Sequence, residues 1–156
     1  MNDLKLEEDL VILQSPLTTN RAVIESLAQR LHEKAYVKDS FSKAVWQREE
    51  VFPTGLQIGE INVAIPHAEP EHVNQSCISI CSLKEPVPFS RMDDDSQKVN
   101  VKLVLMLALS EAHSHMEVLS KIIRSISDEQ FVKELTQTAD SKKVVQLLQE
   151  RMASEN

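Results

Sequence analysis

The sequence predicts an α/β fold, in which helices cover a mixed β-sheet. In the first and last thirds of the chain, apolar residues recur at helical spacing behind residues that can cap a helix. In the middle third, short apolar runs rich in β-branched residues are separated by turn-forming clusters. Because helices and sheets bury their apolar faces against one another, this order of elements fits a layered domain.

The predicted helices begin at residues that can cap them. Residues 18–20, Thr-Thr-Asn, can cap a helix from about Asn20 to Lys34, whose apolar residues share one face. Asp39 or Ser40 can cap a second helix that reaches about Glu50. The residues expected to cap three later helices are Ser114, Asp128, and Asp140 or Ser141.

Three apolar runs in the middle of the chain are predicted as strands. They are Ile61–Ile65, Cys77–Leu83 and Val99–Leu109. The segment Lys84–Asp95 holds two prolines and is predicted as a long connection. Its three aspartates, Asp93–Asp95, fit a solvated turn better than a cation site, because blocks of like charge usually face solvent.

The composition is that of an ordinary globular protein. The chain has 156 residues, of which 42% are hydrophobic and 26% are charged, and we expect one domain over residues 1–156 with its core between about residues 10 and 152. The net charge of -7 argues against a nucleic-acid surface. It does not exclude a local basic pocket.

Two features of the sequence predict a cytoplasmic protein that is not inserted in a membrane. The acidic start, residues 1–9, lacks the basic and apolar regions of an export signal. The longest apolar run, Leu103–Leu109, is far shorter than the roughly 20 residues that cross a bilayer. Cys77 and Cys81 are expected to be buried free thiols, since four residues along one strand separate them too far for an easy disulfide.

His67 is the first candidate for a functional residue. It follows the predicted strand Ile61–Ile65, and Pro66 interrupts regular pairing because proline has no backbone N–H. Loops on a rigid scaffold commonly carry reactive side chains, and histidine suits proton or phosphoryl chemistry near neutral pH. The alternative is a histidine that merely ends a strand.

His115 is the second candidate. Ser114 and Glu117 fit the capping-box pattern, which places His115 in the first turn of a helix. The positive end of the helix disfavours an imidazolium and attracts an anion, so His115 could help to bind a phosphate. The alternative is an exposed histidine without function.

Arg48 and Thr54 are further candidates for an anion site. The planar guanidinium of Arg48 suits bidentate contact with a phosphate, although it could equally pair with a nearby carboxylate. Thr54 supplies a hydroxyl in the following loop. A zinc site built from several histidines is not expected, because the sequence lacks a compact motif with helical i, i+4 histidines and a general-base carboxylate.

An ordered set of short motifs resembles the IIA component of the sugar phosphotransferase system, in its fructose and mannitol branch. The resemblance runs from about residue 17 to residue 149. Its motifs are Arg48-Glu49, Pro53-Thr54-Gly55, Ile61-x-Val63-Ala64-Ile65-Pro66-His67 and His115-x-x-Val118-Leu119. Within this branch, the segments 46–49, 52–56 and 93–95 look most like galactitol-type IIA proteins.

The resemblance implies a single-domain mixed sheet of about five strands with helices on both faces, and a phosphotransferase activity. His67 would accept a phosphoryl group from the phosphocarrier protein HPr and pass it to a IIB component, with the membrane component IIC as an indirect partner. His115 would lie beside it, Arg48 would contact phosphate or partner, and Thr54 could offer its hydroxyl. No cofactor or metal is implied, since the phosphoryl group arrives already activated on another histidine.

Two questions follow from the resemblance. Most relatives have glycine after the active histidine, whereas this chain has Ala68, so the local backbone is expected to be less permissive. The alternative function is that of the nitrogen-related branch, in which phosphorylation of His67 controls protein binding rather than sugar transport.

Overall fold

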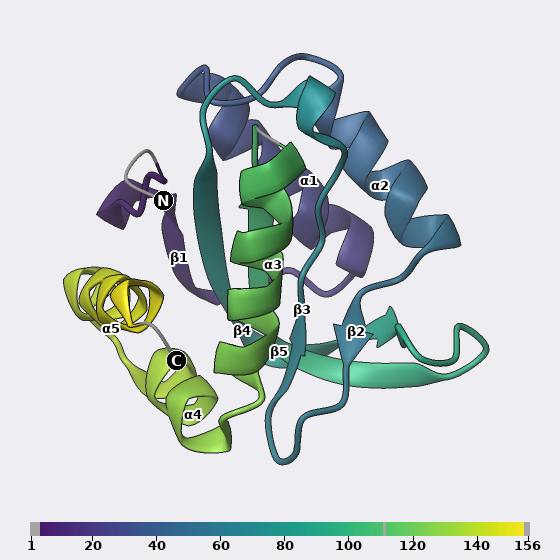
Figure 1. Ribbon diagram of the computed structural model, residues 1–156. Helices are drawn as coiled ribbons and strands as arrows, with labels where there is room; N and C mark the ends of the chain where they lie inside the picture. Colours follow the sequence, from purple (N-terminus) through teal and green to yellow (C-terminus); the bar gives the residue numbers. More distant parts are fainter. Residues whose placement is uncertain (1–3, 111, 155–156) are drawn as a thin grey trace.

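The computed structural model describes residues 4–110 and 112–154, and for residues 112–115 it describes the backbone alone. The strands are β1 (Val11–Ser15), β2 (Gly55–Leu56), β3 (Asn62–Ala64), β4 (Cys77–Ser90) and β5 (Lys98–Ala108) (Figure 1). The helices are α1 (Asn20–Glu33), α2 (Phe41–Val51), α3 (Ala112–Ile126), α4 (Glu129–Gln137) and α5 (Ser141–Ala153). Two short 3-10 helices are η1 (Glu8–Leu10) and η2 (Pro70–His72).

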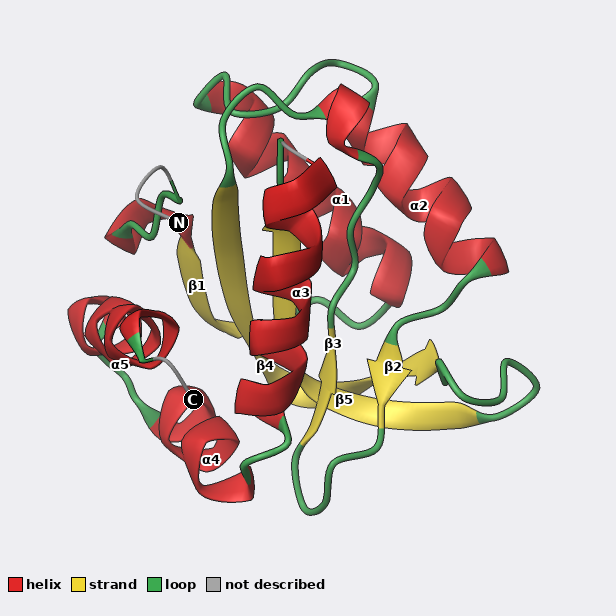
Figure 2. Cartoon of the chain, viewed as in Figure 1, coloured by secondary structure: helices red, strands yellow, loops and turns green. Residues whose placement is uncertain are grey.

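The strands form one mixed sheet in the order β1-β4-β5-β3-β2. β1 runs parallel to β4 and β3 parallel to β5, whereas β4 with β5 and β2 with β3 are antiparallel. Figure 2 shows α3 lying across one face of the sheet, with α1 on the other. The predicted mixed sheet of five strands with helices on both faces is therefore confirmed.

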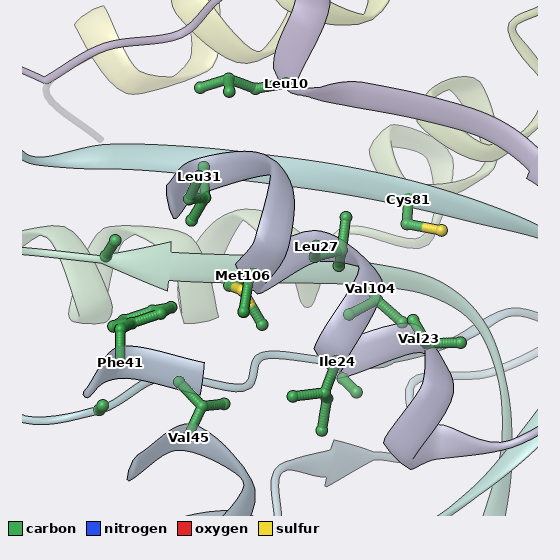
Figure 3. Packing of buried hydrophobic residues seen from close by; sticks show 14 of the residues in the cluster. Leu10, Val23, Ile24, Leu27, Leu31, Phe41, Val45, Cys81, Val104 and Met106 are labelled. Carbon is green, nitrogen blue, oxygen red and sulfur yellow. The ribbon is translucent and has the colours of Figure 1, made fainter. Parts of the chain in front are cut away.

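Each face of the sheet has its own apolar core. Side chains of α1 and α2, among them Leu27, Leu31 and Phe41, pack on one face (Figure 3). Those of α3, α4 and α5 pack on the other. Because successive residues of a strand point to opposite faces, a strand that is buried on both sides is apolar at consecutive positions, which explains the unbroken apolar run of residues 103–108 in β5.

The predicted helix caps are correct at three helices. Thr19, Asp128 and Asp140 each accept a hydrogen bond from a backbone N–H of the first turn. Ser40 stands at the start of α2 but makes no such bond. The prediction that Ser114 caps a helix is wrong, because α3 begins two residues earlier, at Ala112, and alanine is the strongest helix former.

The prediction of a connection over Lys84–Asp95 is also wrong, because β4 continues to Ser90. It pairs with β5 as far as Ser90 and Lys98, after a register shift between Ser82 and Val87. On its other side, β1 ends at Ser15, opposite Leu83. Proline is compatible with a strand that has an unpaired edge, which explains how Pro86 and Pro88 fit into β4.

The remaining predictions about buried and exposed groups agree with the structure. Cys77 and Cys81 are buried free thiols, and burial raises their pKa values to about 12 and about 11. Asp93–Asp95 are exposed.

Within the described residues, no helix is long and apolar enough to cross a bilayer.

Candidate functional site

His67 is held at the end of a strand next to the centre of the sheet. β3 ends at Ala64, and Ile65 and Pro66 carry the chain on alongside β5. The N–H of Leu107 donates to the carbonyl of Pro66 over 3.0 Å, and His67 itself makes an isolated parallel bridge with Leu107. The histidine is only 6% exposed, so the scaffold restricts both its backbone and its side chain.

The ring of His67 is oriented by its own loop. Nδ1 lies 2.8 Å from the backbone carbonyl oxygen of Ile65. A carbonyl oxygen can only accept, so Nδ1 carries the proton of this bond. In a neutral ring, Nε2 then holds the lone pair and is the nitrogen suited to act as a nucleophile.

A buried carboxylate and a buried hydroxyl support the strand end that leads to His67. The backbone N–H and the hydroxyl of Thr54 donate to the two carboxylate oxygens of Glu49, over 2.8 and 2.9 Å. The N–H of Ile65 donates to the hydroxyl oxygen of Thr54 over 3.2 Å. Burial raises the pKa of Glu49, and the two bonds from Thr54 oppose that shift.

The Thr54 hydroxyl thus has partners within the protein. Its single O–H points to Glu49, and its oxygen accepts from Ile65, which is the residue two before His67. A hydroxyl has one proton to donate, so in this arrangement it is not offered to a phosphoryl oxygen. Thr54 is 2% exposed.

Arg48 reaches the loop that carries His67. Its Nη1 donates to Glu69 over 3.0 Å, and its guanidinium lies 5.5 Å from the centre of the Phe52 ring. The Nε atom is buried and has no hydrogen-bond partner among the residues that the structure describes. The structure therefore joins a cation in the last turn of α2 to Glu69, the loop residue two positions after His67.

His115 lies in the early part of α3, but its side chain falls outside the described residues. The prediction that it stands beside His67 stays a prediction. In the described parts of the chain, no three His, Cys, Asp or Glu side chains gather in a way that could hold a metal ion.

Ala68 fits its position without strain. Among described residues other than glycine, only Gln14 and Ala35 have positive φ angles, so Ala68 does not adopt the left-handed conformation that favours glycine. Its side chain is 2% exposed and belongs to the core beneath α1 and α2. The backbone around His67 does not need glycine here.

Two carboxylates of this region, Glu49 and Glu69, have contacts that the sequence did not predict, although Glu49 belongs to one of the family motifs. Glu49 lies eight residues after Phe41 and four after Val45, and all three are buried on one face of α2. This i, i+4, i+8 spacing is a signal that predicts a buried carboxylate. Glu69 offered no comparable signal, because it is an exposed loop residue that only the folded chain brings to Arg48.

Comparisons with known proteins agree with the fold and with the family resemblance of the sequence. Residues 5–151 match the family model "Phosphoenolpyruvate-dependent sugar phosphotransferase system, EIIA 2". In overall structure, the chain resembles the IIA subunit in the complex of enzyme IIAMtl and phosphorylated enzyme IIBMtl from Escherichia coli. The TM-score is 0.77 at 24% identity, covering 94% of this chain and 99% of that one.

Three curated proteins illustrate the range of relatives. Multiphosphoryl transfer protein 2 of Escherichia coli K12 is 35% identical over 69% of this chain, and transcriptional regulator ManR of Bacillus subtilis is 33% identical over 81%. The galactitol-specific EIIA component of Escherichia coli O6:H1 is 28% identical over 72% of this chain and 75% of its own length. The chain matches only 12% of the multiphosphoryl transfer protein and 18% of ManR.

The fold is thus that of a mannitol-type EIIA domain, a class of phosphoryl carriers. The chain belongs to the EIIA 2 family of the phosphoenolpyruvate-dependent sugar phosphotransferase system.

Proposed function

We propose that the protein accepts a phosphoryl group from HPr on Nε2 of His67 and passes it to a IIB component during sugar uptake. The observation that carries the proposal is the bond between Nδ1 of His67 and the Ile65 carbonyl, which leaves the lone pair on Nε2. Membership of the EIIA 2 family supports HPr as the phosphoryl donor and a IIB component as the acceptor. A cytoplasmic location, where such partners act, is part of the proposal.

The chemical step exchanges one P–N bond for another. The Nε2 lone pair of His67 attacks the phosphorus of a phosphohistidine on HPr, and a new P–N bond forms. The bond to the donor nitrogen breaks, and its electron pair returns to the donor ring. Nδ1 of His67 keeps its proton, so the Ile65 carbonyl stabilises the positive charge on the phosphorylated ring. Onward transfer repeats the exchange, with the nucleophile of IIB attacking phosphorus.

We propose that the guanidinium of Arg48 stabilises the negative charge of the transferred phosphoryl group. In the unphosphorylated protein, its guanidinium is paired with Glu69, whose side chain is 63% exposed. A phosphoryl group on His67 carries more negative charge than a carboxylate and competes for the same cation. We propose that His115 assists by contact with the phosphoryl oxygens.

The test is phosphorylation of the purified protein by phosphoenolpyruvate, enzyme I and HPr. We expect one acid-labile phosphoryl group per chain, detected by intact-protein mass spectrometry, and none in a His67→Ala variant. His72→Ala is the matched control, because His72 is a histidine of the same loop and bonds Ser40. If the His67→Ala variant is phosphorylated like the wild type, His67 is not the acceptor.

The narrower proposal is a sugar alcohol of the galactitol type as the transported substrate. The galactitol-specific relative, matched over three quarters of its length, supports it. The test is transfer from the phosphorylated protein to purified galactitol and mannitol IIB components. Faster transfer to the mannitol protein would contradict the galactitol assignment.

The second candidate is a regulatory module in which phosphorylation of His67 controls protein binding. The similarity to transcriptional regulator ManR over 81% of this chain favours it. Phosphorylation by HPr without transfer to any IIB component would support this candidate over the carrier role.

A further inference from the structure

We infer that Glu49 and Thr54 are positioning residues that fix the orientation and the tautomer of His67 through the backbone of Ile65. The inference rests on the proposed function, because it assigns these residues to the same phosphoryl-transfer site. Neither residue needs to touch the transferred group. They act on the nucleophile by way of the strand end that carries it.

The direction of each hydrogen bond in this chain follows from its donors and acceptors. The N–H of Ile65 can only donate, so the Thr54 hydroxyl oxygen accepts from it. The hydroxyl proton must then point to its other neighbour, the carboxylate of Glu49, 2.9 Å away. The second carboxylate oxygen of Glu49 accepts from the backbone N–H of Thr54, which holds the carboxylate in place beside Thr54.

The next link in the chain is Ile65 itself. Its N–H is bound by Thr54, and its carbonyl accepts from Nδ1 of His67 over 2.8 Å. Both backbone polar groups of this fully buried residue are therefore used to connect α2 with the imidazole. On the opposite side, the Leu107 N–H holds the carbonyl of Pro66, so the segment before His67 is fixed from two directions.

Burial makes this chain of bonds effective. Glu49 is 5% exposed, Thr54 2% and His67 6%. Hydrogen bonds in such surroundings are stronger than in water, and a polar group left unpaired there costs more free energy than one at the surface. If Ile65 shifts, Nδ1 loses its acceptor, and the tautomer that carries its proton on Nε2 becomes populated. That tautomer has no lone pair on Nε2 with which to attack phosphorus.

The test combines a spectroscopic and a kinetic measurement on Thr54→Val, which keeps the shape of the side chain and removes the hydroxyl. The tautomer of His67 is measured by nitrogen-15 NMR of the unphosphorylated protein above the pH at which its ring is charged. The rate of phosphorylation by HPr is measured by rapid quench. We expect the Nδ1–H tautomer to dominate in the wild type and to lose population in the variant. The rate should fall by about tenfold to a hundredfold, since small displacements of a reacting group have effects of this size.

Two variants separate positioning from a loss of stability. Thr136→Val is the matched control, because Thr136 is also buried, and its hydroxyl donates to the Val132 carbonyl in α4 over 2.7 Å. It should leave tautomer and rate unchanged. Thr54→Ser, which restores a hydroxyl, should recover most of both. If Thr54→Val fails to fold, Glu49→Gln gives the same test, since an amide accepts at only one of the two positions that Thr54 needs.

The inference is overturned if Thr54→Val, or Glu49→Gln in its place, shows the tautomer and the rate of the Thr136→Val control. Failure of the proposed function gives a different result. If the wild type is not phosphorylated on His67, the carrier role is wrong. The NMR measurement on the unphosphorylated ring still decides whether Glu49 and Thr54 set its tautomer.

Discussion

At the scale of single residues, the site shows what sequence patterns can and cannot predict. The place of His67 at a strand end was predictable because a β-branched run, a proline and a histidine follow one another in the chain. Arg48 was predicted as a contact for phosphate or partner, and the structure brings it to the same loop through Glu69. The role of Glu49 depends on bonds to Thr54 that form only when the turn between them closes, so its chemistry could not be read from composition.

Removal of the Glu69 charge should favour the phosphorylated state. In Glu69→Gln, Arg48 loses its carboxylate partner, and a negative charge two residues from His67 disappears. We expect the equilibrium constant for accepting a phosphoryl group from HPr to rise about two- to fivefold, because exposed ion pairs contribute up to about 1 kcal/mol. The measurement is the phosphorylated fraction at fixed ratios of the two proteins. Glu71→Gln removes an exposed charge of the same loop and should have less effect. Equal changes in the two variants would show that only net charge matters.

The buried carboxyl group of Glu49 should make stability depend on pH. Burial raises its pKa in the folded protein above the value in the unfolded chain. Between these two values the folded state retains a proton that the unfolded state has released, so stability falls as pH rises through this window. The Glu49→Gln variant cannot titrate at this site. We therefore expect the unfolding free energy of the variant minus that of the wild type to increase as pH rises from about pH 4. Urea unfolding of both proteins at a series of pH values measures this. A pH-independent difference would contradict the raised pKa.

At the scale of the secondary-structure elements, local signals predicted most elements, and tertiary pairing decided the exceptions. Thr19, Asp128 and Asp140 bind the first turns of their helices as their sequence positions indicate. The segment after Leu83 reads locally as a loop because of its prolines, yet pairing with β5 extends the strand to Ser90. That pairing joins residues far apart in the chain and leaves no short-range pattern.

The end of α1 offers a prediction about helix stability. Ala35 has a φ of 61°, with its N–H bonded to the His32 carbonyl and the Tyr36 N–H to the Leu31 carbonyl. This is the Schellman arrangement, in which glycine is favoured at the position of Ala35. Ala35→Gly should raise the unfolding free energy by roughly 0.5–1 kcal/mol, because the left-handed strain of about 1–2 kcal/mol outweighs the greater entropy of unfolded glycine. Thermal unfolding measures the change. Ala153→Gly, at the last position of α5, is the comparison and should not stabilise the protein.

At the scale of the whole molecule, two apolar cores share one sheet, and this sharing should make the domain unfold as a unit. The cluster under α1 and α2 and the cluster under α3, α4 and α5 both rest on β4 and β5. The layered order of helices and strands was predictable from periodicity. The number of strands and the cover on both faces came from the family resemblance, because the two-residue strand β2 is too short to leave a pattern in sequence.

Unfolding experiments can test this coupling, because the single tryptophan reports on one core. Trp46 packs against the cluster under α1 and α2, while Leu135 lies in the other cluster. Leu135→Ala should lower the unfolding free energy by about 2–5 kcal/mol, like Leu27→Ala on the tryptophan side. If the sheet couples the cores, Trp46 fluorescence and circular dichroism will give the same unfolding midpoint as each other within each variant. A tryptophan transition that stays at the wild-type midpoint in Leu135→Ala would mean that the two sides unfold separately.

The part of β4 that extends beyond β1 has a consequence for association between molecules. An unpaired strand edge is a template on which a strand of another molecule can add, and this is a route to aggregation. Here the extended part contains Pro86 and Pro88, which have no N–H to donate to an added strand, and the neighbouring Lys84 and Glu85 are charged and exposed. The two prolines, which suggest a loop when the sequence is read locally, therefore also disfavour the addition of a strand from another copy of the chain to the ribbon of β4 and β5.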